Sequence, residues 1–302
     1  MYIRTGEGLA RGLLQYSLGT WAASTLPAST NGKLYQFNSK NGGATTAVYV
    51  PNAALASNPV QLLVWIHGDI LPCCDEGKDA VSYVKSETFP LAKQLADSKR
   101  PFVLVVPTMH WMRGQSMHTL GEPTTMNAFL DEVRTGLTGA GWSSAPSFGR
   151  LILAGHSHAY AVFNQLAARV SDAQSSKGAL AKLADVWLLD TTYGSGKNKQ
   201  AICMNWMGWA KAKSRVNLRI FYRRDSGTAA LAECIRDEAA KAGLSNVAVQ
   251  GFHHCLLSHC DMPRDRMPAL LAASILKPLV LVIPPSIRTV ADEPSWIDTV
   301  RR

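Results

Sequence analysis

Residues 151–160, LILAGHSHAY, join an apolar strand pattern to an apolar helix pattern through a turn centred on Ser157. A turn this sharp between a strand and a helix strains the backbone of the central serine and exposes its hydroxyl, so the residues two positions to either side must be small. Gly155 and Ala159 meet that requirement. Ser157 is therefore the candidate nucleophile, and the alternative is an ordinary serine cap at the start of a helix.

Apolar runs and longer helical patterns alternate on both sides of this turn, which predicts an α/β fold with a mostly parallel sheet and helices on both faces. The interior runs, among them LLVWI at 62–66 and FVLVV at 102–106, are almost continuously apolar, as strands buried on both faces are. The first two strand candidates are more polar, flank NGG at 41–43 and are expected to pair as an antiparallel hairpin at the sheet edge. We expect eight strands, at 33–38, 47–50, 61–66, 102–106, 150–154, 186–189, 218–222 and 247–251. We expect helices near 82–97, 126–139, 158–173, 199–213, 229–242 and 266–275.

The composition of the 302-residue chain, 47% hydrophobic and 18% charged, is typical of a globular enzyme with a large core. No linker or repeat divides the chain, so residues 1–302 are expected to form one domain, with a core at about 33–275 and irregular extensions at both ends. No membrane span is expected, because no run of eighteen apolar residues occurs. The N-terminal residues lack the pattern of a signal peptide, and localisation, cytoplasmic or secreted, stays open.

The net charge of +9 comes from scattered lysines and arginines, which indicates a basic, soluble surface and argues against a nucleic-acid partner. The six cysteines are too few for a disulfide scaffold in a chain of this length, and their pairing is left open. No GxGxxG motif follows the first expected strand and no phosphate-binding loop occurs, so no cofactor is expected. Nothing in the sequence indicates an oligomeric state.

With a strand before it and a helix after it, the GHSHA turn resembles the serine turn of the α/β-hydrolase superfamily, and the resemblance covers about residues 33–275. GHSHAY followed by LLDTTYG at 188–194 is similar to bacterial members of the esterase and lipase type. The resemblance implies the α/β-hydrolase fold, a Ser-His-Asp triad and hydrolysis of carboxylic esters through an acyl-serine intermediate.

An HGD sequence at 67–69 follows the third expected strand. In the superfamily an HG pair at this place begins the loop that binds the oxyanion of the tetrahedral intermediate. The resemblance therefore implies that the backbone N–H groups of Asp69 and His158 are the oxyanion-hole donors. The alternative is a plain glycine turn after a strand.

Three histidines, His253, His254 and His259, stand between the last expected strand and the last expected helix. The resemblance places the general base shortly before the final helix, which favours His259, with His254 as the next choice. His253 and His254 adjoin the strand end and could instead line the pocket. The segment 253–261 also contains two cysteines and an aspartate, but it lacks the paired spacing of zinc sites, so no metal is expected.

Two aspartates compete for the role of the acid that orients the base. Asp225 ends the seventh expected strand, the commonest place for the acid in the superfamily, but Arg223 and Arg224 beside it offer other partners. Asp190 leaves a wholly apolar strand, where a lone carboxylate is costly without a partner. The two candidates stay nearly equal, with a slight preference for Asp190.

The loop at 109–122 contains methionines, a tryptophan and a leucine, a mixture that suits an adaptable apolar wall over a site; the alternative is packing on the core. The expected substrate pocket comprises His67, His156, Trp111, Met112 and His254. The expected partner is a small-molecule, lipid or polymeric ester. A thioesterase, an amidase or a non-catalytic binding protein on the same fold remains the alternative.

Overall fold

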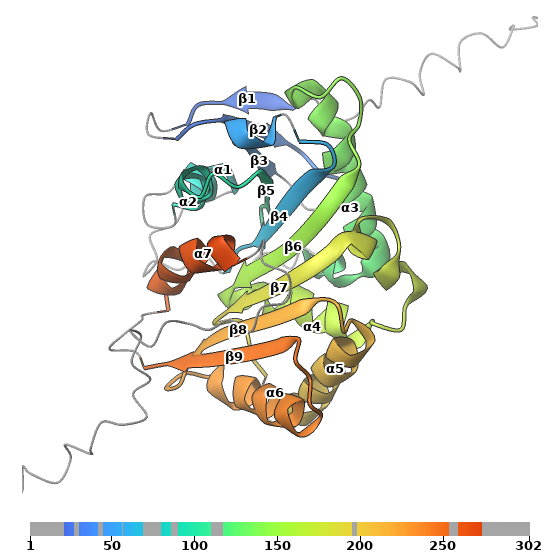
Figure 1. The fold of residues 1–302 in the computed structure, drawn as a ribbon, viewed down its shortest axis with the longest axis vertical. Helices are drawn as coiled ribbons and strands as arrows, with labels where there is room; N and C mark the ends of the chain where they lie inside the picture. Colours follow the sequence, from blue (N-terminus) through green and yellow to red (C-terminus); the bar gives the residue numbers. More distant parts are fainter. Residues whose placement is uncertain are drawn as a thin grey trace, which may run out of the picture.

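The fold is built around a single mixed sheet in the computed structural model (Figure 1). The structure describes residues 21–26, 30–41, 45–55, 57–68, 80–85, 90–109, 117–194, 198–253 and 259–273. Within these residues, nine strands lie in the order β1-β2-β3-β5-β4-β6-β7-β8-β9. From β5 to β9 in this order each pair of neighbouring strands is parallel, whereas the pairs β1–β2, β2–β3 and β3–β5 are antiparallel. The strands are β1 (Ala22–Ser24), β2 (Lys33–Phe37), β3 (Thr46–Val50), β4 (Val60–Ile66), β5 (Phe102–Pro107), β6 (Phe148–His156), β7 (Leu183–Leu189), β8 (Asn217–Arg223) and β9 (Val247–Phe252).

All eight strands expected from the sequence are present, and the mostly parallel sheet is confirmed. The prediction missed β1, because three small residues, AAS, carry no alternation of apolar and polar side chains. As a result β2 does not lie at the sheet edge as expected, since β1 pairs with it. Trp21, immediately before β1, stacks on Phe37 of β2 with ring centroids 5.4 Å apart and so anchors the added strand.

Helices cover both faces of the sheet, as predicted. One face carries α3 (Pro123–Gly136), α4 (Tyr160–Ala168), α5 (Lys199–Ala212) and α6 (Ala229–Lys241), and the other carries α1 (Ala80–Lys85), α2 (Leu91–Asp97) and α7 (Asp261–Ala273) (Figure 1).

Several of the expected helices differ in their bounds: the helix expected near 158–173 covers only Tyr160–Ala168, and the one expected near 126–139 begins and ends three residues earlier. The single helix expected near 82–97 is divided into α1 and α2, with Pro90 immediately before α2, where its missing N–H and its effect on the preceding residue disfavour a continuous helix. Helix α7 begins five residues earlier than the expected start at 266, at Asp261. Pro263 is tolerated there because it lies in the first turn, where the N–H has no partner within the helix.

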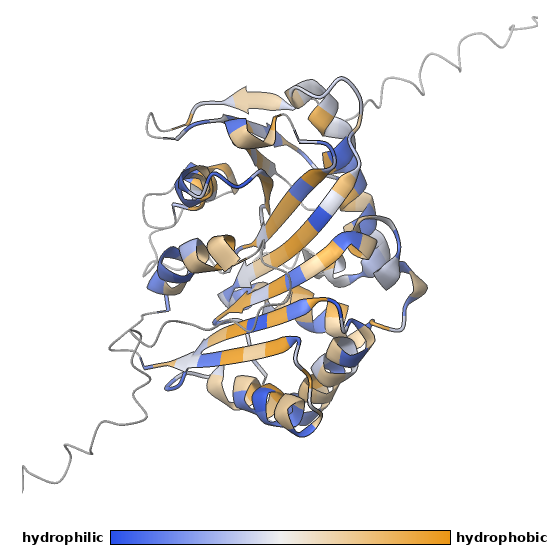
Figure 2. Cartoon of the chain, viewed as in Figure 1, coloured by the Kyte–Doolittle hydropathy of each residue, from blue (hydrophilic) through white to orange (hydrophobic). Residues whose placement is uncertain are grey.

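The interior strands are continuously apolar because both of their faces are buried. In β4, Leu62, Val64 and Ile66 pack into the core beneath α3 to α6, whereas Leu63 and Trp65 pack into the core beneath α1, α2 and α7. Figure 2 shows the same apolar character along the central strands. Successive side chains of a strand point to opposite faces, so each of these strands contributes to two cores.

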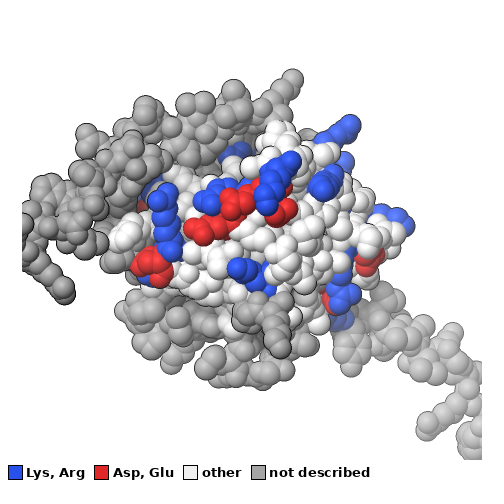
Figure 3. Space-filling view, turned by 90° about the horizontal axis from the view of Figure 1, so that it is seen from below, with Lys and Arg blue, Asp and Glu red and all other residues white. Residues whose placement is uncertain are grey.

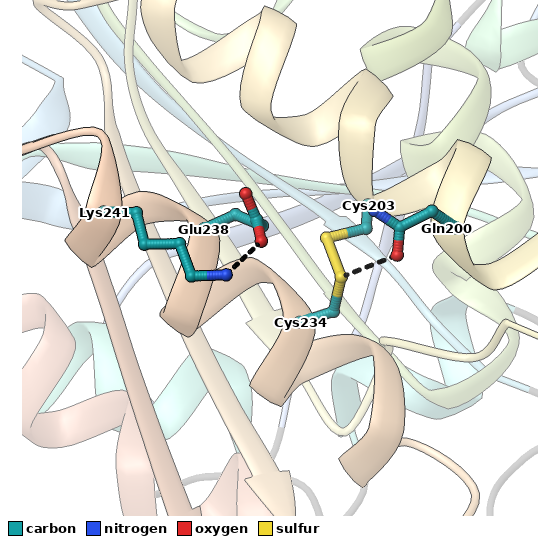
Figure 4. Close-up of a disulfide and its surroundings, with 5 residues drawn as sticks. All are labelled: Gln200, Cys203, Cys234, Glu238 and Lys241. Atoms are coloured by element: carbon teal, nitrogen blue, oxygen red, sulfur yellow. Dashed lines mark hydrogen bonds and ion pairs between the residues drawn. A yellow bond between two sulfur atoms is a disulfide. The ribbon is translucent and has the colours of Figure 1, made fainter.

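A disulfide between Cys203 of α5 and Cys234 of α6 links two helices on the same face of the sheet (Figure 4). The two Cα atoms lie 6.2 Å apart, and 31 positions separate the residues in sequence. Next to it, an ion pair of 2.8 Å joins Lys241 to Glu238 within α6. The structure therefore pairs these two cysteines with each other, which the sequence left open.

Charged side chains of both signs are interleaved on the surface. On the face shown in Figure 3, lysines and arginines lie among aspartates and glutamates. Ion pairs between adjacent residues, such as Arg236 with Asp237 and Arg264 with Asp265, also bring opposite charges together. None of the helices in the described part of the chain combines the length and the apolar character that crossing a bilayer requires.

Candidate active site

The candidate residues gather at one edge of the sheet, because the carboxyl ends of parallel strands meet there. Gly68 follows β4, Ser157 follows β6, Asp190 follows β7 and His259 comes after β9. Strand β6 lies between β4 and β7, so the turn at Ser157 stands at the centre of this group.

Ser157 is the first residue of the short helical segment η6 (Ser157–Ala159), which follows β6 directly in a tight turn and leads into α4. Its φ of +54° lies in the left-handed region, which costs a non-glycine residue on the order of 1 kcal/mol or more. Gly155 has to be small, because a Cβ there would lie 2.8 Å from the Cβ of Ala159 and 2.5 Å from the ring of Phe163. The strained backbone and the small flanking residues expected from the sequence are therefore present.

The turn after β4 lies directly against this serine. A Cβ at Gly68 would stand 2.6 Å from the Cβ of Ser157 and 3.0 Å from the carbonyl oxygen of His156, so only glycine fits. Asp69, the first predicted oxyanion donor, lies outside the described residues. His158, the second, directly follows Ser157 at the N-terminal end of the helical segment.

His259 and Asp190 are brought together from positions 69 residues apart in the sequence. The Nδ1 atom of His259 lies 2.6 Å from Oδ2 of Asp190, whose side chain is 1% exposed, whereas the His259 side chain is 16% exposed. Asp190 also has a left-handed backbone, with φ of +48°, and its N–H donates to the carbonyl of Phe221 in the neighbouring strand β8. The rigid end of β7 thus fixes the carboxylate to which His259 is bonded.

The second carboxylate oxygen of Asp190 accepts hydrogen bonds from the turn after β8. The Thr228 hydroxyl and, at 3.2 Å, the Arg223 backbone N–H both donate to Oδ1. Burial alone would raise the pKa of Asp190, but the hydrogen bonds from His259 and Thr228 outweigh burial and hold the pKa below its ordinary value. An ionised Asp190 accepts the proton of His259 Nδ1, which leaves the lone pair of the neutral imidazole on Nε2.

Asp225, the competing acid candidate, has a different partner. Its carboxylate pairs with the Arg223 guanidinium at 3.1 Å, and both side chains are partly exposed. The structure therefore brings Asp190, and not Asp225, to His259.

His67 and His156, both expected in the substrate pocket, are instead almost fully buried, at 1% and 3% exposure. His67 Nε2 accepts from the backbone N–H of Met109 at 2.8 Å, so its Nδ1 carries the proton and donates to the carbonyl of Gly68 at 2.6 Å. His156 Nε2 lies 2.9 Å from the carbonyl oxygen of His259. Both rings bond to backbone groups, and their place in the substrate pocket stays a prediction from the sequence.

Two further side chains belong to the site that sequence reasoning did not assign. Thr228 donates to Asp190, and Tyr193 lies near enough to Ser157 for the serine hydroxyl to affect the pKa of the phenol. Burial and the negative charge of Asp190 raise the pKa of Tyr193 to about 12, so the phenol stays protonated. Tyr193 stands three residues after Asp190 in LLDTTYG, and this short spacing was the only signal in the sequence that could have indicated it.

Rings continue from Tyr193 along the start of α4. Tyr160 lies 5.5 Å from Tyr193 between ring centroids, and His158 stacks on Tyr160 at 5.0 Å. The predicted pocket residues Trp111, Met112 and His254 lie outside the described residues. In the described part of the loop at 109–122, Met109 and Leu120 are buried and pack on the core. No group of three metal-ligating side chains occurs among the residues that the structure describes.

The buried His156 should make the stability of the protein depend on pH. Burial first, and neighbouring His259 second, lower the pKa of His156 to about 3. The unfolded chain, with an ordinary pKa of about 6.5 at this position, binds more protons, so stability is lost as the pH falls from about 6.5 toward 3. Because glutamine does not titrate, the wild type should lose about 2 kcal/mol more than the His156→Gln variant between pH 7 and pH 5. Urea unfolding of both proteins at the two pH values measures this difference, and an equal loss would show that His156 is protonated in the folded state.

Comparison with known proteins adds to this geometry. The sequence matches no protein-family model and no curated protein. Among solved structures, the chain is similar to an S-formylglutathione hydrolase from Agrobacterium tumefaciens, with a TM-score of 0.51 and 14% identity over 84% of this chain and 98% of that one. It is also similar to esterase B from Lactobacillus rhamnosis, with a TM-score of 0.50 and 10% identity over 88% of this chain and 90% of that one. Likeness at these identities concerns the fold, and together with the strand order it shows that the chain has the α/β-hydrolase fold.

Proposed function

We propose that the protein is a serine hydrolase that cleaves carboxylic esters through an acyl intermediate on Ser157. The observation that carries this proposal is the hydrogen bond of 2.6 Å between His259 and an ionised, buried Asp190, beside a serine held in a left-handed turn. A serine is a weak nucleophile by itself, and an adjacent base that is itself oriented by a carboxylate is what activates it.

In the proposed reaction the Ser157 oxygen attacks the ester carbonyl while Nε2 of His259 takes the hydroxyl proton. Asp190 stabilises the imidazolium that forms and keeps the other nitrogen protonated. The backbone N–H groups of Asp69 and His158 are the proposed donors to the oxyanion. Collapse of the tetrahedral intermediate releases the alcohol, which receives the proton from His259, and water then attacks the acyl-serine by the same route in reverse.

Two further features support this proposal. Gly68 brings the backbone of the turn after β4 directly against Ser157, because any larger residue there would clash with the serine. One of the two similar structures is named an esterase and the other a hydrolase, and both have the fold of this chain. Fold alone does not decide chemistry, so the site residues carry the proposal.

A fluorophosphonate probe should label the protein once, at Ser157, because an activated serine attacks phosphorus as it attacks an acyl carbon. Mass spectrometry of a tryptic digest locates the adduct. In parallel, p-nitrophenyl esters of several chain lengths measure turnover, and prior labelling should remove it in proportion to the adduct. Label on a different serine, or full turnover by fully labelled protein, would rule out Ser157 as the nucleophile. An unlabelled protein that turns over no ester of the series would favour a binding role.

A further inference from the structure

We infer that His156 is a positioning residue for the base: its Nε2–H holds the main chain of His259 and thereby keeps the imidazole between Asp190 and Ser157. This inference rests on the proposed function. It assigns to the residue before the nucleophile a task that neither the sequence nor the fold indicates.

The contact between the two histidines involves backbone and ring together. Nε2 of His156 lies 2.9 Å from the carbonyl oxygen of His259, and the two ring centroids lie 4.3 Å apart at an angle of 35°. A carbonyl oxygen can only accept, so His156 must carry its proton on Nε2. His156 itself is the last residue of β6, a central strand paired on both sides, and the residue is 3% exposed.

His259 needs such a second point of attachment. Its side chain is bonded to Asp190 through Nδ1, and a single hydrogen bond leaves an imidazole able to tilt about that bond. The hydrogen bond from His156 fixes the main chain from which the imidazole projects. Strand β7 thus holds the side chain of the base through Asp190, and strand β6 holds its backbone through His156.

The same strand also carries the nucleophile. Ser157, which loses its proton in the proposed reaction, directly follows His156 in the chain. His156 in turn bonds to the main chain of His259, the proposed base. The hydrogen bond from His156 therefore ties the main chain of the proposed base to the residue next to the proposed nucleophile. A small displacement of a base from its nucleophile is costly, since an error of about 1 Å can reduce a rate on the order of a hundredfold.

The charge state of His156 suits this task. A histidinium at this position would lie 4.3 Å from the imidazolium that forms on His259 and would oppose it. Burial keeps His156 neutral and lowers its pKa to about 3. His156 is therefore too weak a base to compete with His259 for the serine proton.

The test compares His156→Phe, which keeps a ring but loses the donor, with His156→Gln, which keeps an amide donor but loses the ring. For the wild type and both variants we would measure kcat, KM, the rate of fluorophosphonate labelling at Ser157 and the melting temperature. His156→Phe should lower kcat and the labelling rate on the order of 30- to 100-fold with KM changed less than about twofold, and His156→Gln should recover to within about fivefold of the wild type. A split of this kind between kcat and KM, with rescue by glutamine, is not expected of a ring that only fills space.

If His156→Phe does not fold, His156→Met replaces it in the comparison, because methionine matches glutamine in length and lacks the amide donor. Donor-free variants that keep kcat within about threefold of the wild type would overturn the inference. Equal losses in the glutamine variant and its donor-free partner would assign the effect to packing and overturn it as well. A wild type that neither turns over esters nor labels at Ser157 would instead refute the proposed function itself, and the inference with it.

Discussion

Replacement of Ser157 by alanine should abolish ester turnover, with a loss of at least about a thousandfold in kcat, while the fold stays intact. Serine and alanine share the same Cβ, so the left-handed backbone at this position is equally strained in both and the crowded contact with Gly68 does not change. The hydroxyl oxygen, which no other atom of the turn replaces, is lost. Stability should change by no more than about 1 kcal/mol, because the side chain is small and the cavity left is minor.

Initial rates with a p-nitrophenyl ester and a thermal melt of both proteins measure these two effects. Ser144→Ala, the same atomic change at an exposed position in the loop before β6, is the matched control and should behave as the wild type. Turnover by Ser157→Ala above about one part in a thousand of the wild-type rate would remove Ser157 from the role of nucleophile.

Replacement of Asp190 by asparagine should lower turnover on the order of a thousandfold or more, through the tautomer of the base. The Thr228 hydroxyl and the Arg223 N–H both donate to Oδ1, so the asparagine must place its carbonyl oxygen there and turn its amide nitrogen toward His259. Nδ1 of His259 then has to accept, which puts the imidazole proton on Nε2, where it blocks uptake of the serine proton. Asparagine also tolerates a left-handed backbone well, so φ of +48° should persist.

Asp225→Asn is the matched control for this substitution. It removes an equal charge from a partly exposed ion pair with Arg223, and it should cost less than about 1 kcal/mol of stability and leave kcat unchanged. Rates and urea unfolding of the two variants, measured together, separate the two aspartates. A slow Asp225→Asn protein with a normal Asp190→Asn protein would move the acid to the end of β8, and two normal variants would contradict a triad built on His259.

The sequence predicted most of the sheet because the apolar pattern of these strands can be recognised from their own residues. LLVWI and FVLVV have to be buried on both faces, and the serine turn has to have small residues on either side, whatever the rest of the chain does. The strand β1 could not be predicted in the same way, since three small residues gain their structure only by pairing with β2 and from the anchoring Trp21.

The choice between Asp190 and Asp225 depends on contacts that neighbouring residues in the sequence do not reveal. Each follows a strand, and the residues beside them in the sequence favour Asp190 only slightly. The distinction lies in contacts between positions far apart: 69 residues separate Asp190 from His259, and 38 separate it from Thr228. The 103 residues between His156 and His259 likewise hid the contact on which the inference about His156 is based. The roles of Asp69, Trp111, Met112 and His254 stay predictions from the sequence.

The disulfide between Cys203 and Cys234 closes a loop that contains the whole of β8 together with Arg223 and Thr228, the residues that hold Oδ1 of Asp190. A cross-link of this span removes conformational entropy from the unfolded chain, worth on the order of 3–4 kcal/mol in the chain-entropy account. Ser157 and β6 lie outside the loop. Reduction of this disulfide would therefore return conformational entropy to the unfolded chain and lower the free energy of unfolding of the protein, while every contact to Oδ1 of Asp190 could still form. Ester turnover measured in a buffer that contains a thiol would then be that of a less stable enzyme.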